Sequence, residues 1–225
     1  MNRRDLMILA AALGAAGLPA LAESHEPMAD GAAEAGTDGA AEMAADAPAV
    51  EIPEIAVGDE GAPVTVVEYA SFTCPHCRRF AEDVYPTIKA EYVDTGKVRF
   101  VYREVFFDRY GLWAAMVARC AGTDRYMAVA DMIFAKQSEW TQGEPAEVAD
   151  NLRRLGLSAG LTKEELDACL SDGATAEALV ANYEKNAAAD DIRATPSFVV
   201  NGEPMSNMSL DEMRKRLDAA VEAAS

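Results

Sequence analysis

The pattern of apolar and polar positions along the chain predicts three strands. Val64–Ala70 is a largely apolar, β-branched run, which is typical of a buried central strand. Lys97–Glu104 places its large apolar side chains mainly on one face and predicts a second strand. Pro196–Val200 predicts a third strand. It runs into Asn201 and Gly202, a dipeptide strongly favoured in two-residue hairpin turns.

Helical patterns occupy most of the remaining chain. A helix is expected to begin at Cys74 and to run to about Thr95, where Gly96 ends it. Pro86 lies inside this helix and should kink or break it, because proline lacks the N–H that an α-helix requires there. A long stretch of several helices is then expected from about 108 to 189.

Two of the predicted helix starts carry the capping-box pattern. Thr162–Glu165 precedes a helix of the long helical stretch, and Ser209–Glu212 opens a C-terminal helix that runs to about Ala223. The predicted order is strand, helix, strand, helical stretch, hairpin and helix. This order indicates an α/β domain over 51–225 with an all-helical insertion at about 108–189.

The first 22 residues have the pattern of a cleaved signal peptide. Arg3 and Arg4 form a positive start, residues 6–18 are mostly apolar, and Ala20–Ala22 supplies the small-x-small cleavage pattern. A membrane anchor is the alternative, but about 13 apolar residues are too few to cross a bilayer. We therefore expect export to the periplasm, and the adjacent arginines also suggest the twin-arginine route.

Residues 23–50 are expected to be a disordered acidic linker. They are rich in Ala, Glu, Asp, Gly and Pro and hold almost no large apolar side chain, so they cannot bury enough surface to offset the entropy of ordering. The whole chain has a formal charge of −18. This charge argues against nucleic acid as a partner, because phosphates require basic patches.

The chemistry that the sequence suggests lies in the Cys74-Pro75-His76-Cys77 motif at the start of the first predicted helix. Unpaired backbone N–H groups and the helix dipole at that position favour the thiolate of Cys74. Pro75 suits the first helical turn, and His76 can add a positive charge or a hydrogen bond near the Cys74 sulfur. Cys77 is expected to be more buried and to resolve a mixed disulfide.

Two other interpretations of the cysteine pair are a static disulfide and half of a metal site. A tetrahedral zinc site needs four ligands at suitable spacing. The chain has only two histidines, one of which, His25, lies in the linker, and Cys120 and Cys169 are isolated in sequence. Thiol–disulfide exchange is therefore the preferred interpretation.

The segments Val67–Cys77 (VEYASFTCPHC) and Ala194–Phe198 (ATPSF) together closely resemble the DsbA family of periplasmic disulfide oxidoreductases. The resemblance covers about residues 52–222. It implies a thioredoxin fold interrupted by a helical domain. It also implies a cis peptide between Thr195 and Pro196, next to the cysteine pair, where it shapes the substrate groove.

The resemblance extends to Glu68, which matches a buried acidic residue thought to aid proton transfer beneath the resolving cysteine. The alternative for Glu68 is an ordinary carboxylate at a sheet edge. Asp191 and Ala194 stand where many relatives have glycine in the loop before the proline. This departure leaves the shape of the loop, and with it the substrate preference, open.

The activity implied by the resemblance is oxidation of paired cysteines in newly exported proteins. Cys74 forms the mixed disulfide, and a membrane quinone reductase like DsbB restores the enzyme disulfide. We expect no cofactor beyond the redox-active disulfide, and a monomer. The alternatives are a disulfide isomerase or reductase kept reduced by another membrane partner, and a copper-handling thioredoxin-like module, which Met205, Met208 and Met213 would serve.

Cys120 and Cys169 fall in separate helices of the expected insertion. A structural disulfide between them would close a loop of about 50 residues and contribute roughly 4 kcal/mol of stability. Relatives with a cysteine pair in the insertion favour this pairing. Two free buried thiols and a second redox pair are the alternatives.

Overall fold

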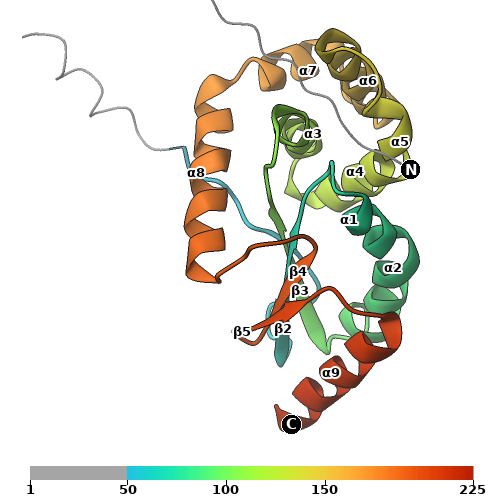
Figure 1. Cartoon of the computed structure of the whole chain (residues 1–225), viewed down its shortest axis with the longest axis vertical. Helices are drawn as coiled ribbons and strands as arrows, with labels where there is room; N and C mark the ends of the chain where they lie inside the picture. The colour runs from blue at the N-terminus through green and yellow to red at the C-terminus, as the bar shows by residue number, and fades with distance from the viewer. Residues whose placement is uncertain (1–49, 225) are drawn as a thin grey trace, which may run out of the picture. The chain divides into compact units, whose positions relative to one another are not determined.

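The sheet at the centre of the domain has five strands in the order β1-β3-β2-β4-β5. The computed structural model describes residues 50–224 (Figure 1), so the predicted signal peptide and nearly all of the linker lie outside the described residues. β2 pairs in parallel with β3 and antiparallel with β4, which makes it a central strand. The strands are β1 (Ile55–Val57), β2 (Val64–Ala70), β3 (Val98–Glu104), β4 (Ser197–Val200) and β5 (Glu203–Ser206).

β2 has the bounds that its β-branched run predicts, and all but one of its residues are buried. Both faces of the sheet are covered, so alternate side chains of the strand enter different hydrophobic clusters. Val64 and Val66 pack with residues of the helix that follows β2. Val67 and Tyr69 pack on the opposite face, beside Tyr183 of helix α8 (Gly173–Ala189).

The helix predicted from Cys74 to Thr95 forms, but its geometry changes along its length. It consists of α1 (Pro75–Arg79), a π-helical stretch η1 (Phe80–Val84), α2 (Tyr85–Ile88) and a second π-helical stretch η2 (Lys89–Val93). Pro86 lies in the first turn of α2, directly after η1. The wider π-helical turn before a proline accommodates the ring and the missing N–H, so the helix is interrupted there without ending.

Six helices form the segment between β3 and β4, which Figure 1 shows above and beside the sheet. They are α3 (Arg109–Cys120), α4 (Thr123–Ala135), α5 (Gln137–Trp140), α6 (Pro145–Ser158), α7 (Lys163–Leu170) and α8. Thr162 and Glu165 form the predicted capping box of α7. A disulfide joins Cys120 of α3 to Cys169 of α7, with their Cα atoms 6.1 Å apart.

A buried ion pair fixes the helical segment to the sheet. The guanidinium of Arg119 in α3 donates to both carboxylate oxygens of Glu104 at the end of β3, at 2.6 and 2.7 Å. The hydroxyl of Tyr126 in α4 donates to the same carboxylate at 2.9 Å. Because every partner is hydrogen-bonded, the burial of these charges is compensated.

The C-terminal part contains the predicted hairpin and helix. Asn201 and Gly202 both have positive φ angles, 47° and 87°, as a two-residue turn of this kind requires. The Oγ of Ser209 accepts a hydrogen bond from the N–H of Glu212 and caps α9 (Leu210–Ala223). The α/β architecture with a helical insertion therefore matches the predicted fold class. Within residues 50–224, no helix has the length and apolarity that crossing a membrane would require.

Candidate active site

Cys74 lies at the N-cap of α1, at the point where the chain leaves the loop after β2. Its backbone is extended, with φ −82° and ψ 119°, and Pro75 opens the helix. The side chain of Cys77 is fully buried, whereas Cys74 is 9% exposed. The first sulfur is therefore the more accessible one, as the sequence predicts, and the structure has both cysteines as free thiols.

The two cysteines differ strongly in acidity. A hydrogen bond from the Cys77 side chain lowers the pKa of Cys74 to about 5, although burial opposes the shift. The Thr195 side chain and the backbone N–H groups of Cys77 and His76 lower this pKa further. The pKa of Cys77 is raised, first by the hydrogen bond to Cys74, then by burial and by the charge of Glu68. At neutral pH, Cys74 is thus a thiolate beside a neutral thiol.

His76 supplies the expected hydrogen bond near the Cys74 sulfur from its backbone, while its side chain points elsewhere. It is exposed, and its Nδ1 accepts a hydrogen bond from the Arg79 guanidinium at 2.6 Å. The imidazole is therefore engaged with the next turn of the helix. The contribution of His76 to the Cys74 thiolate comes from its backbone N–H, which helps to lower the pKa of Cys74.

The loop before β4 forms the other wall of the site. The Thr195–Pro196 peptide is cis, and the Sγ of Cys74 lies 3.5 Å from the carbonyl oxygen of Thr195. In the same loop, Asp191 has a φ of 51°, in the left-handed region that favours glycine. Its carboxylate accepts two hydrogen bonds from Arg193. Asp191 therefore adopts the backbone conformation for which glycine is suited.

Glu68 is buried in the middle of the sheet, with only 4% of its surface exposed. In the ladder it lies between Tyr102 of β3 and Phe198 of β4, so it is not a carboxylate at a sheet edge. Burial, together with the charges of Asp131 and Cys74, raises the pKa of Glu68 to about 8. At neutral pH this carboxyl group holds a proton, and its charge acts on Cys77 when the proton leaves.

Gln137 also belongs to the site, although no sequence pattern indicates it. It is buried in α5, and its Nε2 donates to the carbonyl oxygens of Phe72 at 2.7 Å and of Cys74 at 3.0 Å. These bonds tie the loop after β2 to the helical segment. A single glutamine in a helical segment has no sequence neighbours that mark it as part of a site, so only the tertiary structure identifies its role.

The methionines that suggested copper lie in the hydrophobic core or pack against it. Met213 is 1% exposed, and Met205 and Met208 pack partly buried against the same cluster. Such use of methionine to fill core gaps is common. Across residues 50–224, no three His, Cys, Asp or Glu side chains come together as a metal site would require.

A thioredoxin-type sheet, a cysteine pair at a helix N-terminus and a cis-proline loop beside it define the class of this protein. The thioredoxin family model matches residues 51–219, so the chain belongs to the thioredoxin family.

Within that family, the solved structures that it resembles include DsbA proteins, as the sequence motifs predict. It is 26% identical to α-DsbA1 of Wolbachia pipientis, with a TM-score of 0.70 over 78% of this chain and 94% of that chain. BdbD of Bacillus subtilis in its oxidised form is 26% identical, with a TM-score of 0.64 over 75% and 93% of the two chains.

Curated sequences give the same result. The chain is 34% identical over 170 residues to a putative protein-disulfide oxidoreductase of Rickettsia bellii, which covers 75% of this chain and 65% of the relative. It is 28% identical to disulfide bond formation protein D of Bacillus subtilis, over 72% of this chain and 74% of that protein. The chain thus spans slightly less than two thirds of the rickettsial relatives that it matches.

Proposed function

We propose that this chain is an exported dithiol oxidase that donates the Cys74–Cys77 disulfide to cysteine pairs of other exported proteins. The observation that carries the proposal is the acidity of Cys74, a thiolate with a pKa of about 5 at the N-cap of α1. A stabilised thiolate favours the reduced enzyme, and therefore makes its disulfide a stronger oxidant. The names of the related disulfide oxidoreductases support the same activity.

In the first step, a client thiolate attacks the Sγ of Cys74 in the oxidised enzyme. A client–Cys74 disulfide forms, the Cys74–Cys77 bond breaks, and Cys77 leaves with the electron pair. A thiolate at Cys77 is costly, because its pKa is raised. Glu68 holds a proton at neutral pH and supplies it to this sulfur. The more accessible sulfur is thus attacked, and the fully buried one is released and protonated.

In the second step, the second client thiolate attacks the client sulfur of the mixed disulfide. A disulfide forms within the client, and Cys74 leaves as a thiolate. A leaving group with a low pKa departs fast, so the acidity of Cys74 favours this step. In total, two electrons pass from the client to the enzyme. The two client thiols release their protons to the solvent, and Glu68 takes up one proton from the solvent to replace the one that it gave to Cys77. No cofactor is needed for this exchange.

The enzyme dithiol must be reoxidised for another turnover. We assign that step to a membrane protein of the DsbB type, which passes the two electrons to a quinone. The predicted signal peptide at residues 1–22 supports export to the periplasm, where disulfides persist. We assign a monomeric state to the enzyme.

The reduction potential of the Cys74–Cys77 pair tests the proposed direction. The full chain is equilibrated with glutathione buffers, thiols are alkylated, and peptide mapping counts the Cys74–Cys77 pair separately from Cys120–Cys169. A potential well above about −180 mV is expected, since that is the value of protein disulfide isomerase. A potential near about −270 mV, the value of thioredoxin, would refute the oxidase and indicate a reductase.

A second assay tests the reaction directly. The oxidised chain is mixed with a reduced peptide that contains two cysteines, and the peptide disulfide is measured. The Cys77→Ser variant, which cannot form the Cys74–Cys77 disulfide, is mixed instead with the oxidised peptide. Its Cys74 thiolate attacks the peptide disulfide and releases one peptide thiolate, and the peptide–Cys74 disulfide should accumulate because the resolving thiol is missing. A Cys74→Ser variant should form no mixed disulfide, and if it did, attack at Cys74 would be wrong.

A further inference from the structure

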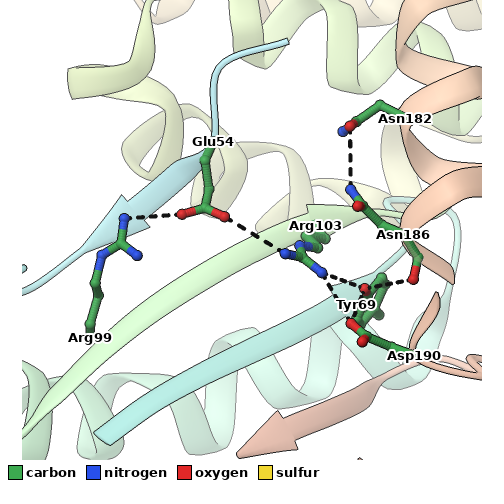
Figure 2. A network of polar contacts seen from close by, with 7 residues as sticks. All are labelled: Glu54, Tyr69, Arg99, Arg103, Asn182, Asn186 and Asp190. Carbon is green, nitrogen blue, oxygen red and sulfur yellow. Dashed lines mark hydrogen bonds and ion pairs between the residues drawn. The ribbon is translucent and has the colours of Figure 1, made fainter. Parts of the chain in front are cut away.

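A polar network on the face of the sheet opposite to Glu68 is not used by the chemistry described above (Figure 2). Its centre is the hydroxyl of Tyr69, which donates to the Oδ2 of Asp190 at 2.5 Å and lies 3.1 Å from the carbonyl oxygen of Asn186. The Nη1 of Arg103 donates to the same hydroxyl at 2.6 Å and to Asp190 at 3.0 Å. Three elements, β2, β3 and the end of α8, therefore meet at one phenol.

The network is held from its far side as well. Glu54, just before β1, accepts from Arg99 at 3.0 Å and lies 3.7 Å from the Nη2 of Arg103 (Figure 2). The ring of Tyr69 is fully buried, and the guanidinium of Arg103 lies 5.5 Å from the ring centre. Charge-assisted hydrogen bonds in such a partly buried position are directional and stronger than those on the surface.

The position of Tyr69 relates this network to the active site. Asp190 is the C-cap of α8 and comes immediately before Asp191, with which the loop to the cis-proline begins. At the other end of the loop, Ser197 pairs with Tyr69 in the β2–β4 ladder. Tyr69 therefore holds both ends of the loop, one through its hydroxyl and one through its backbone.

Thr195, which approaches the Cys74 sulfur, lies within this loop. Two further contacts keep the loop short and closed. The Ile192 N–H donates to the Ala187 carbonyl at 2.8 Å, and the Ser197 hydroxyl donates to the Ala194 carbonyl at 2.8 Å. A displacement of Asp190 would therefore be passed along the loop to the carbonyl of Thr195.

We propose that Tyr69, together with Arg103 and Asp190, is a positioning device that sets the Thr195–Pro196 loop against Cys74 for client binding. The inference rests on the proposed function in one respect, since the client is taken to be a peptide with cysteines. Tyr69 touches neither the reacting sulfurs nor the client. It acts through Asp190 and Ser197.

The test compares Tyr69→Phe with a matched control, Tyr92→Phe. Tyr92 is also buried, and its hydroxyl donates to a carboxylate, Asp218, at 2.8 Å, but it joins η2 to α9 away from the loop. Both variants lose one hydroxyl and keep the ring. With Tyr69→Phe, kcat/KM for oxidation of a two-cysteine peptide should fall about 10-fold, as small misplacements of reacting groups do. The rate with dithiothreitol, which needs no groove, should stay within about 2-fold of the wild type.

A second readout does not depend on client oxidation. Because the Thr195 side chain lowers the pKa of Cys74, a displaced loop should raise the titration midpoint of the Cys74 thiolate in Tyr69→Phe and leave it unchanged in Tyr92→Phe. Failure of the wild-type chain to oxidise the peptide would count against the proposed function, whereas the thiolate titration would still decide the role of Tyr69. Equal midpoints in the two variants, or equal losses with peptide and dithiothreitol, would overturn the positioning role.

If Tyr69→Phe fails to fold, the variant Asp190→Asn tests the same positioning role. The amide has the same shape but cannot pair with the charge of Arg103. The same selective loss with the peptide is expected. If Tyr69 and Asp190 act as one unit, the double variant should lose no more than the worse single variant. Additive losses would show that the two residues act separately and would overturn the proposal.

Discussion

The sulfur of Cys74 lies 3.5 Å from the carbonyl oxygen of Thr195, a residue that follows it by 121 positions. The two residues belong to the opposite ends of the domain in sequence, and the antiparallel pairing of β2 with β4 brings them together. Two loops that are far apart in the sequence therefore form the surroundings of the reactive thiol.

The first prediction concerns the acidity of Cys74. In the reduced protein, its thiolate absorbance in the ultraviolet should titrate with a midpoint at about pH 5, the pKa of this thiol. The hydrogen bond from Cys77 makes the largest contribution, so Cys77→Ala should move the midpoint upward. Cys74→Ser should remove the transition. An unchanged midpoint in Cys77→Ala would show that the helix N-terminus alone stabilises the thiolate.

The second prediction concerns Glu68 and stability. Its pKa is raised from the ordinary value of 4.5 to about 8 by folding, so the folded state binds more protons than the unfolded chain between these values. Stability due to this group therefore falls as pH rises from about 4.5 to about 8. Glu68→Gln removes this loss of stability. At about pH 7, the free energy of unfolding of the variant should therefore exceed that of the wild type by on the order of 3 kcal/mol.

Urea unfolding at several pH values checks this expectation. The difference between Glu68→Gln and the wild type should be small at about pH 4 and should grow until about pH 8. A difference that does not depend on pH would contradict the buried neutral carboxyl. The same variant should slow the formation of the mixed disulfide, because no proton is then supplied to Cys77.

The third prediction concerns the disulfide between α3 and α7. Cys120 and Cys169 are separated by 49 positions, and a loop of that length contributes about 4 kcal/mol in the chain-entropy model. Cys120→Ala/Cys169→Ala should lower the free energy of unfolding by about that amount. The Cys74 thiolate should titrate as in the wild type. A shifted titration would indicate that the second pair acts on the active site.

The fourth prediction concerns Asp191 at its positive φ. Asp191→Gly should change stability little, since glycine adopts this conformation freely and the ion pair to Arg193 is exposed. Asp191→Val should cost about 1–3 kcal/mol, because a β-branched residue is strained there. Thermal unfolding of both variants provides the comparison. Equal losses would show that the side-chain contacts of Asp191, and not its backbone, matter.

Local patterns predicted much of the fold. The bounds of β2, the hairpin at Asn201 and Gly202, and the capping box at Thr162–Glu165 all appear in the structure, because each depends on neighbours in sequence. β1 was not predicted, because three residues are too few to show an alternation of apolar and polar positions. The π-helical stretches around Pro86 were not predicted either, because proline signals only an interruption.

The burial of Cys77 and of Glu68 could be predicted, because both residues stand in one continuous motif. The resemblance supplied the cis geometry at Thr195–Pro196, which sequence patterns alone do not favour. The contacts of Gln137 with the carbonyl groups near Cys74, and the hydrogen bond from Tyr69 to Asp190, join residues more than 60 positions apart. Such pairs have no local signature, and only the folded chain reveals them.

Glu68 and Tyr69 are neighbours in β2, yet one faces the cysteines and the other faces α8. An insertion or deletion of one residue in this strand would exchange their faces, placing a phenol beneath Cys77 and a carboxyl group against Asp190. In the helical segment, the loops between the helices can take up a change of one residue while Arg119, Gln137 and Asp190 keep their contacts. Evolutionary change in chain length should therefore concentrate within residues 108–189 and be absent between Val64 and Cys77.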